Sequence, residues 1–382
     1  MKVQAAVCTG LHEPWKTTEI EIDEPHDHEV KVKMAYSGMC HSDEHLRTGD
    51  ITAPLETLQV FGVESMFPIL GGHEGAGVVE EVGGLVQSVA PGDQVAVAFI
   101  PACGLCFWCA SGRQHLCDLG MTTLAGPMIA DGTWRYHLNG ENLNRMAQLG
   151  TFADTMVVHE ASLVKIAPDA NLKAAALISC GLSTGFGSVV DRAKTAPGEV
   201  VVVIGAGGVG SGAIQGARIA GAGAVVVVDP IESKLERASK IGATHTATNI
   251  LDATFLVADL TQGRMADVVV LTPGVLTGEF IAQACGIGSK DARIVTTAIA
   301  PAGQNTVDLN LFNFAMFNQS LLGTVFGSVS PRVQVPRLLK LYDQGQLLVD
   351  ELITTEYTVD QVQQGYDDLA DGKNVRGVVS FR

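Results

Sequence analysis

The chain has 382 residues, more than one small module needs, and at about 150 residues per domain this length corresponds to two or three domains. Hydrophobic residues make up 47% of the sequence and charged residues only 17%, which excludes a disordered chain, a coiled coil and a solvating acidic tail. The 25 basic and 41 acidic residues give a net charge of −16, which disfavours nucleic acid and anionic membrane surfaces as partners.

Two sequence features bear on localisation. The N-terminal residues MKVQAAVCTGLHEPWK contain no uninterrupted apolar segment of the kind found in signal peptides. The charge-free apolar stretch Val200–Ile214 has 15 residues, fewer than the roughly 20 that cross a bilayer. We therefore expect a soluble, cytoplasmic protein.

Short β-type runs dominate the chain from Lys2 to about Val164, and Gly, Pro and Asp turn signals separate them. The clearest runs are residues 30–36, 75–82, 94–100 and 154–161. This half of the chain predicts an irregular, β-rich domain.

Three candidate metal ligands are scattered along the chain. Cys40 stands in GMCHSDEH, His73 precedes Glu74 in GGHEGAG, and Cys180 stands in SCGLSTGFG. Two cysteines and one histidine can hold zinc with a fourth tetrahedral position open. Each residue alone is explained equally well as a small buried side chain or a satisfied polar group, so spacing by itself does not assign this site.

A second set of candidate ligands is local. Cys103, Cys106, Cys109 and Cys117 have the spacing C-x2-C-x2-C-x7-C, which puts four thiolates within reach of one tetrahedral ion. A cytosolic chain of this length needs no disulfides, and these are half of its eight cysteines. Four protein ligands leave no open position, so we expect a structural zinc site. An iron–sulfur cluster and unpaired cysteines are the alternatives.

After Pro168 the pattern changes to apolar strands that alternate with helical segments. The Val- and Ile-rich runs are residues 200–210, 224–230, 267–273 and 292–299, and the helical segments include residues 213–221 and 232–243. Continuous apolar runs separated by helices indicate a parallel sheet that is buried on both faces.

A glycine-rich motif follows the first of these runs and opens a helix, as a dinucleotide-binding fingerprint requires. Its residues are Gly205, Ala206, Gly207, Gly208, Val209 and Gly210. The first glycine makes a tight turn, the second lets the backbone approach a pyrophosphate, and the helix N-terminus favours phosphate. Asp229, at the end of the next strand, can accept from a ribose 2′-OH and would repel a 2′-phosphate, so NAD is favoured over NADP. The alternative is a simple glycine turn.

The pattern breaks again near Phe326. Residues 333–345 and 358–372 are helical and residues 375–381 form a strand, and we expect this tail to return to the first domain. The expected domains are therefore 1–181, 182–325 and 326–382, with the third completing the first. The predicted fold class is α/β, with a Rossmann domain inserted into a β-rich catalytic domain.

Read together, these motifs resemble the zinc-dependent medium-chain alcohol dehydrogenases over essentially the whole chain. The resemblance implies that the β-rich domain is GroES-like and that Cys40, His73 and Cys180 hold a catalytic zinc. By the same likeness Asp43 orients His73, and Glu74 lies behind the metal as a transient ligand.

Further residues are assigned by the same resemblance. Ser42 takes the alcohol proton and His45 passes it to solvent, whereas a polar loop is the alternative for both. His41 replaces an arginine that often faces the pyrophosphate. Phe99 corresponds to a substrate-pocket position, with a core position as the alternative.

The resemblance also supplies contacts to the cofactor. Thr184 lies under the nicotinamide, Arg376 binds the pyrophosphate, and Lys234 joins Asp229 at the adenosine ribose. An exposed helical lysine is ordinarily just solvated, which is the alternative for Lys234.

Four stretches resemble one subgroup, the actinobacterial nicotinoprotein alcohol dehydrogenases assayed with dimethylnitrosoaniline and associated with mycofactocin. These stretches are residues 55–74, 99–120, 149–162 and 242–248. The subgroup implies that NAD stays bound and is reoxidised in place by a small acceptor, with residues 51–68 as a candidate cover.

We therefore expect a zinc- and NAD-dependent enzyme that oxidises a small alcohol to an aldehyde or ketone. It would carry two zinc ions per chain and form a homo-oligomer, a dimer or tetramer, through the edge of the nucleotide-binding sheet. The alternatives are an ordinary dehydrogenase with dissociable NAD, of the alcohol or formaldehyde type, a zinc-free quinone reductase and a non-enzymatic NAD-binding zinc protein. The alcohol itself depends on loops that include residues 51–68 and 125–149.

Overall fold

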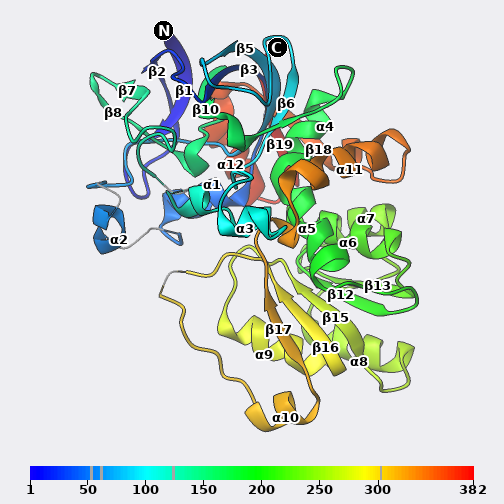
Figure 1. The fold of residues 1–382 in the computed structure, drawn as a ribbon. Helices are drawn as coiled ribbons and strands as arrows, with labels where there is room; N and C mark the ends of the chain where they lie inside the picture. The colour runs from blue at the N-terminus through cyan, green and yellow to red at the C-terminus, as the bar shows by residue number, and fades with distance from the viewer. Residues whose placement is uncertain (52–54, 61–62, 123–124, 302) are drawn as a thin grey trace. The chain divides into compact units, whose positions relative to one another are not determined.

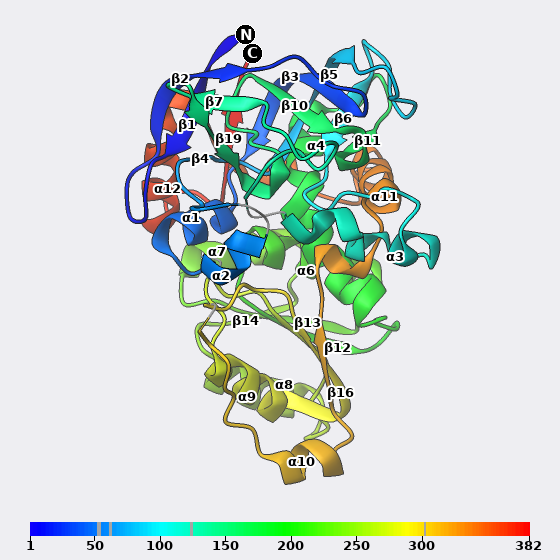
Figure 2. The ribbon, with the colours of Figure 1, turned by 60° about the vertical axis from the view of Figure 1, so that its left-hand side comes forward.

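The computed structural model describes residues 1–51, 55–60, 63–122, 125–301 and 303–382. The chain divides into two units, which are drawn in Figures 1 and 2. The first unit comprises Met1–Cys180, Ser330–Leu341 and Val349–Arg382, and the second comprises Gly181–Val329 and Tyr342–Leu348. Residues 326–329 and 342–348, which we expected in the first domain, thus group with the second.

The first unit is built on two sheets. Among the described residues, one sheet has six strands in the order β8(Glu141–Asn142), β7(Tyr136–Leu138), β2(Lys16–Ile22), β1(Lys2–Cys8), β4(Ile69–Leu70) and β9(Asn144–Arg145). The other has the order β11(Leu163–Lys165), β6(Gln94–Val97), β5(Glu74–Val82), β3(Glu29–Gly38), β19(Arg376–Ser380) and β18(Ile353–Tyr357), with β10(Thr155–His159) also paired with β3.

Strand β3 is the centre of this second sheet and is buried along nearly its whole length. It pairs antiparallel with β5, β10 and β19, with Val378 opposite Gly38. The C-terminal strand therefore completes a sheet that begins near the N-terminus. Most of the tail of the chain thus lies with the first unit, and most of the second unit is inserted before it.

The second unit contains a parallel sheet. Its strand order is β14(His245–Ala247), β13(Ala224–Val228), β12(Val200–Ile204), β15(Ala266–Leu271), β16(Gly288–Thr296) and β17(Ser320–Gly323). Every residue of β12 and β13 is buried, which explains their unbroken valine runs. The strand order reverses between β12 and β15, which is where such sheets bind ligands.

Helices cover both faces of this sheet. The helices α6(Gly208–Ile219) and α7(Glu232–Ile241) lie on one face, and α8(Ile250–Leu260) and α9(Gly278–Ile287) lie on the other (Figure 1). Both faces are therefore apolar, and the core of the unit lies between helix and strand layers.

Further helices complete the structure. The α-helices are α1(His41–Thr48), α2(Leu55–Val60), α3(Phe107–Ala110), α4(Leu172–Leu177), α5(Ser183–Gly187), α10(Leu311–Met316), α11(Pro331–Asp343) and α12(Val362–Ala370). The π-helices are η5(Ile178–Leu182) and η6(Ser188–Arg192). The 3₁₀ turns are η1(Gln114–Leu116), η2(Asp118–Thr122), η3(Met146–Gln148), η4(Glu160–Ser162), η7(Phe326–Ser328), η8(Asp350–Leu352) and η9(Val359–Gln361).

One helical stretch, Leu172–Arg192, is long and apolar enough to cross a membrane by length and composition alone. It is longer than Val200–Ile214, the stretch singled out from the sequence. In the structure 89% of its apolar window is buried, as expected of a helix in a protein core.

Candidate active site and metal-binding lobe

The first candidate site gathers residues from three distant segments of the first unit. Ligand atoms of Cys40, His73, Glu74 and Cys180 all lie within 4.8 Å of one another, and all four residues are buried. His73 directly precedes β5, and Glu74 is the first residue of that strand. Cys40 follows β3 and is the N-cap of α1, and Cys180 lies in η5. Local π-helical turns of this kind are frequent at functional sites.

A buried carboxylate fixes the orientation of the histidine in this cluster. Asp43 Oδ2 lies 2.9 Å from His73 Nδ1, and Asp43 Oδ1 accepts a 2.7 Å hydrogen bond from the backbone N–H of Gly72. Both side chains are almost inaccessible to solvent. Since Nδ1 faces a carboxylate, Nε2 is the nitrogen left to bind a metal.

The charges within the cluster are strongly coupled. A hydrogen bond from Cys180 holds the pKa of the Cys40 thiol well below its ordinary value, and the same bond raises the pKa of Cys180. Burial alone would lower the pKa of His73, but Asp43 and the Cys40 thiolate outweigh it and raise the pKa. Two thiols and one imidazole thus lie close together in the buried interior. Zinc prefers such soft and borderline donors, so the set fits this ion.

Glu74 makes a further buried ion pair. Its Oε2 contacts the Arg376 guanidinium, and both side chains are almost fully buried. A Cβ atom at Gly38 would lie closer than 3.0 Å to that carboxylate oxygen, so a side chain there would displace the Glu74 carboxylate from its present position. Arg376, expected at a pyrophosphate, is thus held beside the metal ligands.

Helix α1 carries the predicted proton-relay residues. Ser42 Oγ lies 3.6 Å from Cys40 Sγ, and His45 lies one turn further along the helix. The exposed His41 lies with its ring centroid 4.6 Å from that of His45. His45 Nδ1 is 2.8 Å from Asp50 Oδ2, a contact that the sequence analysis did not anticipate.

Two aromatic residues border the cluster. The Phe99 ring meets the His73 ring edge-on, with centroids 5.9 Å apart, and it also packs against the core of the unit. The buried Tyr366 donates a 3.2 Å hydrogen bond to the backbone carbonyl of Cys40. Tyr366 lies far along the chain in α12, and no local sequence signal connected it to Cys40.

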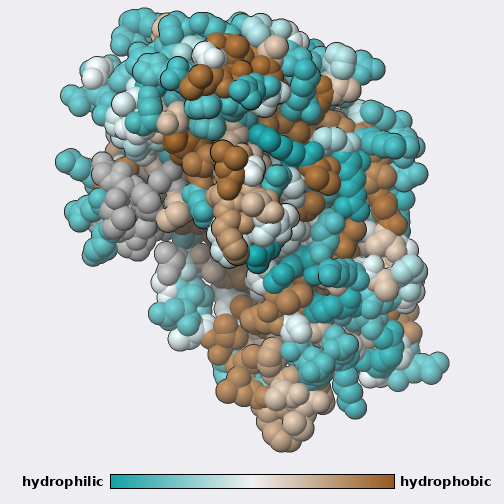
Figure 3. Space-filling view, viewed as in Figure 1, coloured by the Kyte–Doolittle hydropathy of each residue, from teal (hydrophilic) through white to brown (hydrophobic). Residues whose placement is uncertain are grey.

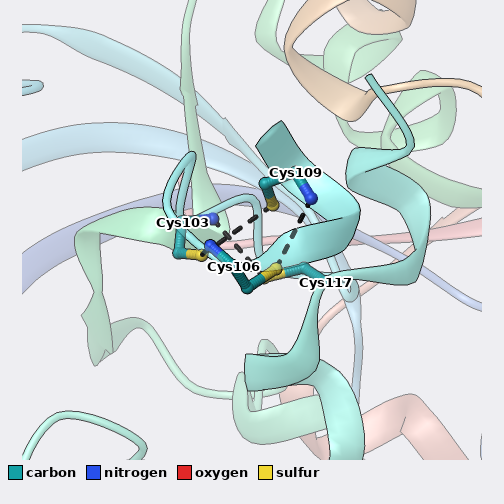
Figure 4. Close-up of side chains that lie close together, drawn as sticks. All are labelled: Cys103, Cys106, Cys109 and Cys117. Atoms are coloured by element: carbon teal, nitrogen blue, oxygen red, sulfur yellow. Dashed lines mark hydrogen bonds between the residues drawn. The ribbon is translucent and has the colours of Figure 1, made fainter. Parts of the chain in front are cut away.

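The second candidate site is the local set of cysteines, which lies in one lobe (Figure 4). The thiols of Cys103, Cys106, Cys109 and Cys117 all lie within 4.8 Å of one another. The Cys103 and Cys109 sulfurs are 3.8 Å apart, and the Cys106 and Cys117 sulfurs are 4.0 Å apart. Thiolates bound tetrahedrally at about 2.3 Å from zinc would be separated by about 3.8 Å, so the cage fits this ion.

Backbone N–H groups point at the sulfurs of the lobe. The N–H of Cys106 lies 3.4 Å from Cys103 Sγ, and that of Cys109 lies 3.5 Å from Cys106 Sγ. Burial favours a higher pKa for Cys106, but backbone hydrogen bonds at Asp118 and Cys109 outweigh it and lower the pKa to about 7. At Cys117, burial raises the pKa to about 12. All eight cysteines of the chain are free of disulfides.

The glycine-rich motif lies at the switch point of the second unit's sheet. Gly205 has φ of 103°, and a Cβ atom there would lie closer than 3.0 Å to the backbone of Thr272. A Cβ atom at Gly210 would likewise clash with the Gly205 carbonyl. A Cβ atom added at Gly207, in contrast, would have no atom of the described residues within 4 Å. This open space beside a helix N-terminus fits a bound pyrophosphate.

The remaining predicted cofactor residues lie in the same unit. Asp229 directly follows β13, and its oxygens accept hydrogen bonds from the N–H groups of Ala206 at 2.9 Å and Ile231 at 3.0 Å. Lys234 is half-buried in the first turn of α7. Within the described residues, the buried Thr184 Oγ1 has no hydrogen-bond partner, which fits a contact to a ligand.

The fold and the two ligand sets define a zinc-binding oxidoreductase with a dinucleotide-binding domain. Residues 26–169 match the alcohol dehydrogenase GroES-like domain, and residues 208–344 match the zinc-binding dehydrogenase domain. The chain belongs to the zinc-dependent medium-chain alcohol dehydrogenase family.

Individual relatives agree with this assignment. The chain is 43% identical over 381 residues to alcohol dehydrogenase B of Mycobacterium tuberculosis, which covers 100% of this chain and 99% of that protein. It is 41% identical over 379 residues to the NDMA-dependent alcohol dehydrogenase of Amycolatopsis methanolica, covering 99% of each. The structure of benzyl alcohol dehydrogenase from Acinetobacter calcoaceticus matches with a TM-score of 0.89 and 26% identity over 100% of both chains.

The prediction of a zinc-dependent alcohol dehydrogenase that uses zinc and NAD is therefore confirmed at the level of the family. The zinc-free and non-enzymatic alternatives do not fit this family assignment or the two ligand sets in the structure.

Proposed function

We propose that this enzyme oxidises a small alcohol with an NAD molecule that stays bound and is reoxidised in place by a small external acceptor. The observation that carries the proposal is the 41% identity, over 99% of both chains, to a relative whose name states its dependence on NDMA. A nicotinoprotein of this kind would accept electrons from the alcohol and pass them to a mycofactocin-like acceptor.

Residues of the first unit have distinct roles in the proposed reaction. Zinc held by Cys40, His73 and Cys180 supplies Lewis-acid chemistry that lowers the pKa of an alcohol hydroxyl, and NAD supplies the hydride acceptor. Ser42, adjacent to Cys40, takes the hydroxyl proton.

His45 receives this proton next, because residues three apart on a helix are neighbours and His45 is three positions after Ser42. Asp43 keeps His73 in the tautomer that binds metal. Phe99, packed edge-on against His73, forms part of the alcohol pocket. Glu74, which forms an ion pair with Arg376, would be available as a further ligand to the metal.

The second unit binds the cofactor. The motif Gly205–Gly210 and the N-terminus of α6 hold the pyrophosphate, and Thr184 supports the nicotinamide. Asp229 and Lys234 bind the adenosine ribose, and the Asp229 carboxylate disfavours NADP. Arg376 and His41 of the first unit supply positive charge for the phosphates. Residues 51–68 would cover retained NAD, although residues 52–54 and 61–62 lie outside the described part of the chain.

We also propose that two or four copies of the chain associate through the β17 edge of the parallel sheet. Exposed apolar side chains gather on α10 and β17, where Figure 3 has hydrophobic colour, and they are Leu311, Phe312, Met316, Phe317 and Leu321. An open edge with such residues needs a cover in solution.

Because its thiols must stay reduced to bind metal, we place the enzyme in the cytoplasm.

The experiment that tests the proposed function is elemental analysis with cofactor extraction from gel-filtered protein, followed by turnover assays. We expect two zinc ions and one NAD per chain. Alcohol alone should produce the absorbance of NADH once per chain, and dimethylnitrosoaniline should sustain turnover without added NAD. If the protein is cofactor-free and turns over only with added NAD, it is an ordinary dehydrogenase with dissociable cofactor.

A further inference from the structure

Asp50 lies just beyond the C-terminal end of helix α1, where the chain reverses. Gly49 adopts the left-handed conformation with φ of 91°, which ends the helix. The N–H groups of Gly49 and Ile51 both donate to the carbonyl of His45, at 3.1 and 3.3 Å. This turn brings the side chain of Asp50 back over the last turn of the helix.

The turn places a carboxylate against the buried ring of His45. Asp50 Oδ2 lies 2.8 Å from His45 Nδ1 and accepts a 2.8 Å hydrogen bond from Thr48 Oγ1. The His45 side chain is 3% exposed and that of Asp50 is 28% exposed. Since little water reaches the ring, its orientation has to be set by protein groups.

The position of this carboxylate is electrostatically unusual. An acid at a helix C-terminus faces the negative end of the helix dipole, which raises its free energy. Nevertheless the pKa of Asp50 is lowered, first by its hydrogen bond with His45 and then by that with Thr48. The hydrogen bonds from His45 and Thr48 therefore outweigh the unfavourable helix end and stabilise the ionised carboxylate at this place.

We propose that Asp50 is a positioning residue for the proton relay, accepting the Nδ1–H of His45 and thereby leaving the Nε2 lone pair to receive the proton from Ser42. The inference rests on the proposed function, in which Ser42 and His45 carry that proton. It repeats at the relay what Asp43 does for His73: one carboxylate selects the tautomer of one buried histidine. The competing role is purely structural, with Asp50 only closing the end of α1.

The first test reads the tautomer directly and needs no activity. Protein labelled with ¹⁵N-histidine is examined by NMR at about pH 9, where an imidazole of ordinary pKa is neutral, and the His45 signals are assigned with H45Q. We expect the Nδ1–H tautomer in the wild type. In D50A it should shift toward Nε2–H or average between the two forms. An Nε2–H tautomer in the wild type would overturn the proposal.

The conservative variant separates geometry from charge. In D50N the amide oxygen can replace Oδ2 as the acceptor for both Thr48 and His45, so this variant should retain the Nδ1–H tautomer and most of the turnover. If D50A does not fold, D50N compared with wild type still decides the question. An Nε2–H tautomer together with unchanged turnover in D50N would contradict the positioning role.

The second test is a double-mutant cycle on turnover by the holoenzyme. D50A should lose about tenfold, part of the 10²–10⁴ that a positioned base contributes. Adding D50A to H45Q should cost nothing further, because the two residues act as one unit. Additive losses would indicate a structural role for Asp50 and overturn the inference.

A matched control is available on the surface. His137 Nε2 lies 3.0 Å from Asp23 Oδ2 at an exposed position of the same unit, so D23A removes the acceptor of a similar pair away from the site. It should leave turnover unchanged. If S42A and H45Q lose turnover while D50A behaves like D23A, the proposed function stands and the role of Asp50 fails. If the wild type does not oxidise alcohols, the proposed function fails, and the NMR measurement alone decides whether Asp50 sets the tautomer.

Discussion

The two metal-ligand sets of the first unit differ in how the chain builds them. The four cysteines of the lobe lie within Cys103–Cys117, and two of them are only partly buried. Cys40, His73 and Cys180 come from distant segments and lie in the buried interior. A closed set can be made by one loop around its ion, whereas an open set needs a finished fold to hold ligands apart from a free position.

The surroundings of the two sets differ in the same sense. In the lobe, mainly backbone N–H groups approach the sulfurs. Around the open set, side chains rather than backbone groups contact the candidate ligands: Asp43 contacts His73, and Arg376 contacts Glu74. Backbone donors come with the loop conformation, while side-chain partners can tune the reactivity of a metal. This contrast indicates that the lobe supports the fold and that the open set carries out the chemistry.

The largest expected effect is at the open set. Cys180→Ser should leave a folded protein that has lost about 10³-fold or more in turnover, because metal-ion catalysis contributes several kcal/mol. Circular dichroism and zinc content per chain check the fold and the loss of one ion. Cys285→Ser, a cysteine outside both sets, serves as control. Full activity with one zinc per chain would remove the distinction between the sites.

The next effect concerns the proton acceptor, which has no counterpart in the lobe. Ser42→Ala should lower turnover by about 10²-fold or more, because positioned general bases contribute 10²–10⁴-fold. Both zinc ions and NAD should remain bound. Ser111→Ala removes an exposed hydroxyl in the lobe and should have no effect on turnover. Equal behaviour of the two variants would exclude Ser42 from the reaction.

A smaller effect is expected from the partner of the metal-binding histidine. Asp43→Asn should reduce zinc affinity or turnover by about 10–100-fold, the usual range for a carboxylate behind a histidine ligand. Competition with a chelator measures the affinity. Asp118→Asn, an exposed acid next to Cys117, is the matched change in the lobe. A weaker zinc site in this control would mean that side chains matter equally at both sites.

The smallest effect on turnover is expected in the lobe itself. Cys106→Ser should unfold the lobe and lower the melting temperature by about 5–10 °C, as expected for a loss of a few kcal/mol in a chain of this size. The protein that stays folded should turn over within about twofold of wild type. Scanning calorimetry and assays on the gel-filtered fraction provide both numbers. A loss of turnover as large as that of Cys180→Ser would contradict a purely structural lobe.

The same contrast explains how far the sequence predicted the sites. The lobe could be predicted from spacing, since neighbouring ligands constrain each other directly. Cys40 and Cys180 could be grouped only through resemblance to a family, because spacing contains no information about which distant segments meet. Tyr366 was missed for the same reason. Asp50 is only five residues from His45, and an acid directly after a helix-ending glycine is a local signal for a carboxylate folded back on the helix.

In the second unit, the strands with unbroken valine runs and the glycine motif were predictable from local pattern. Helix α8 was not singled out, because Leu251 and Phe255 are exposed on it and obscure the amphipathic pattern. The edge strand β17 was also missed, since its residues are mostly exposed and carry no continuous apolar run.

The confinement of four ligands to Cys103–Cys117 has a consequence for how the lobe can be changed. A single insertion or deletion of one short segment can add or remove the whole lobe while the sheets around it keep their register. The open set has no such freedom, because three segments must change together. The lobe could therefore be removed or replaced as one segment, whereas the buried ligand set depends on the whole domain.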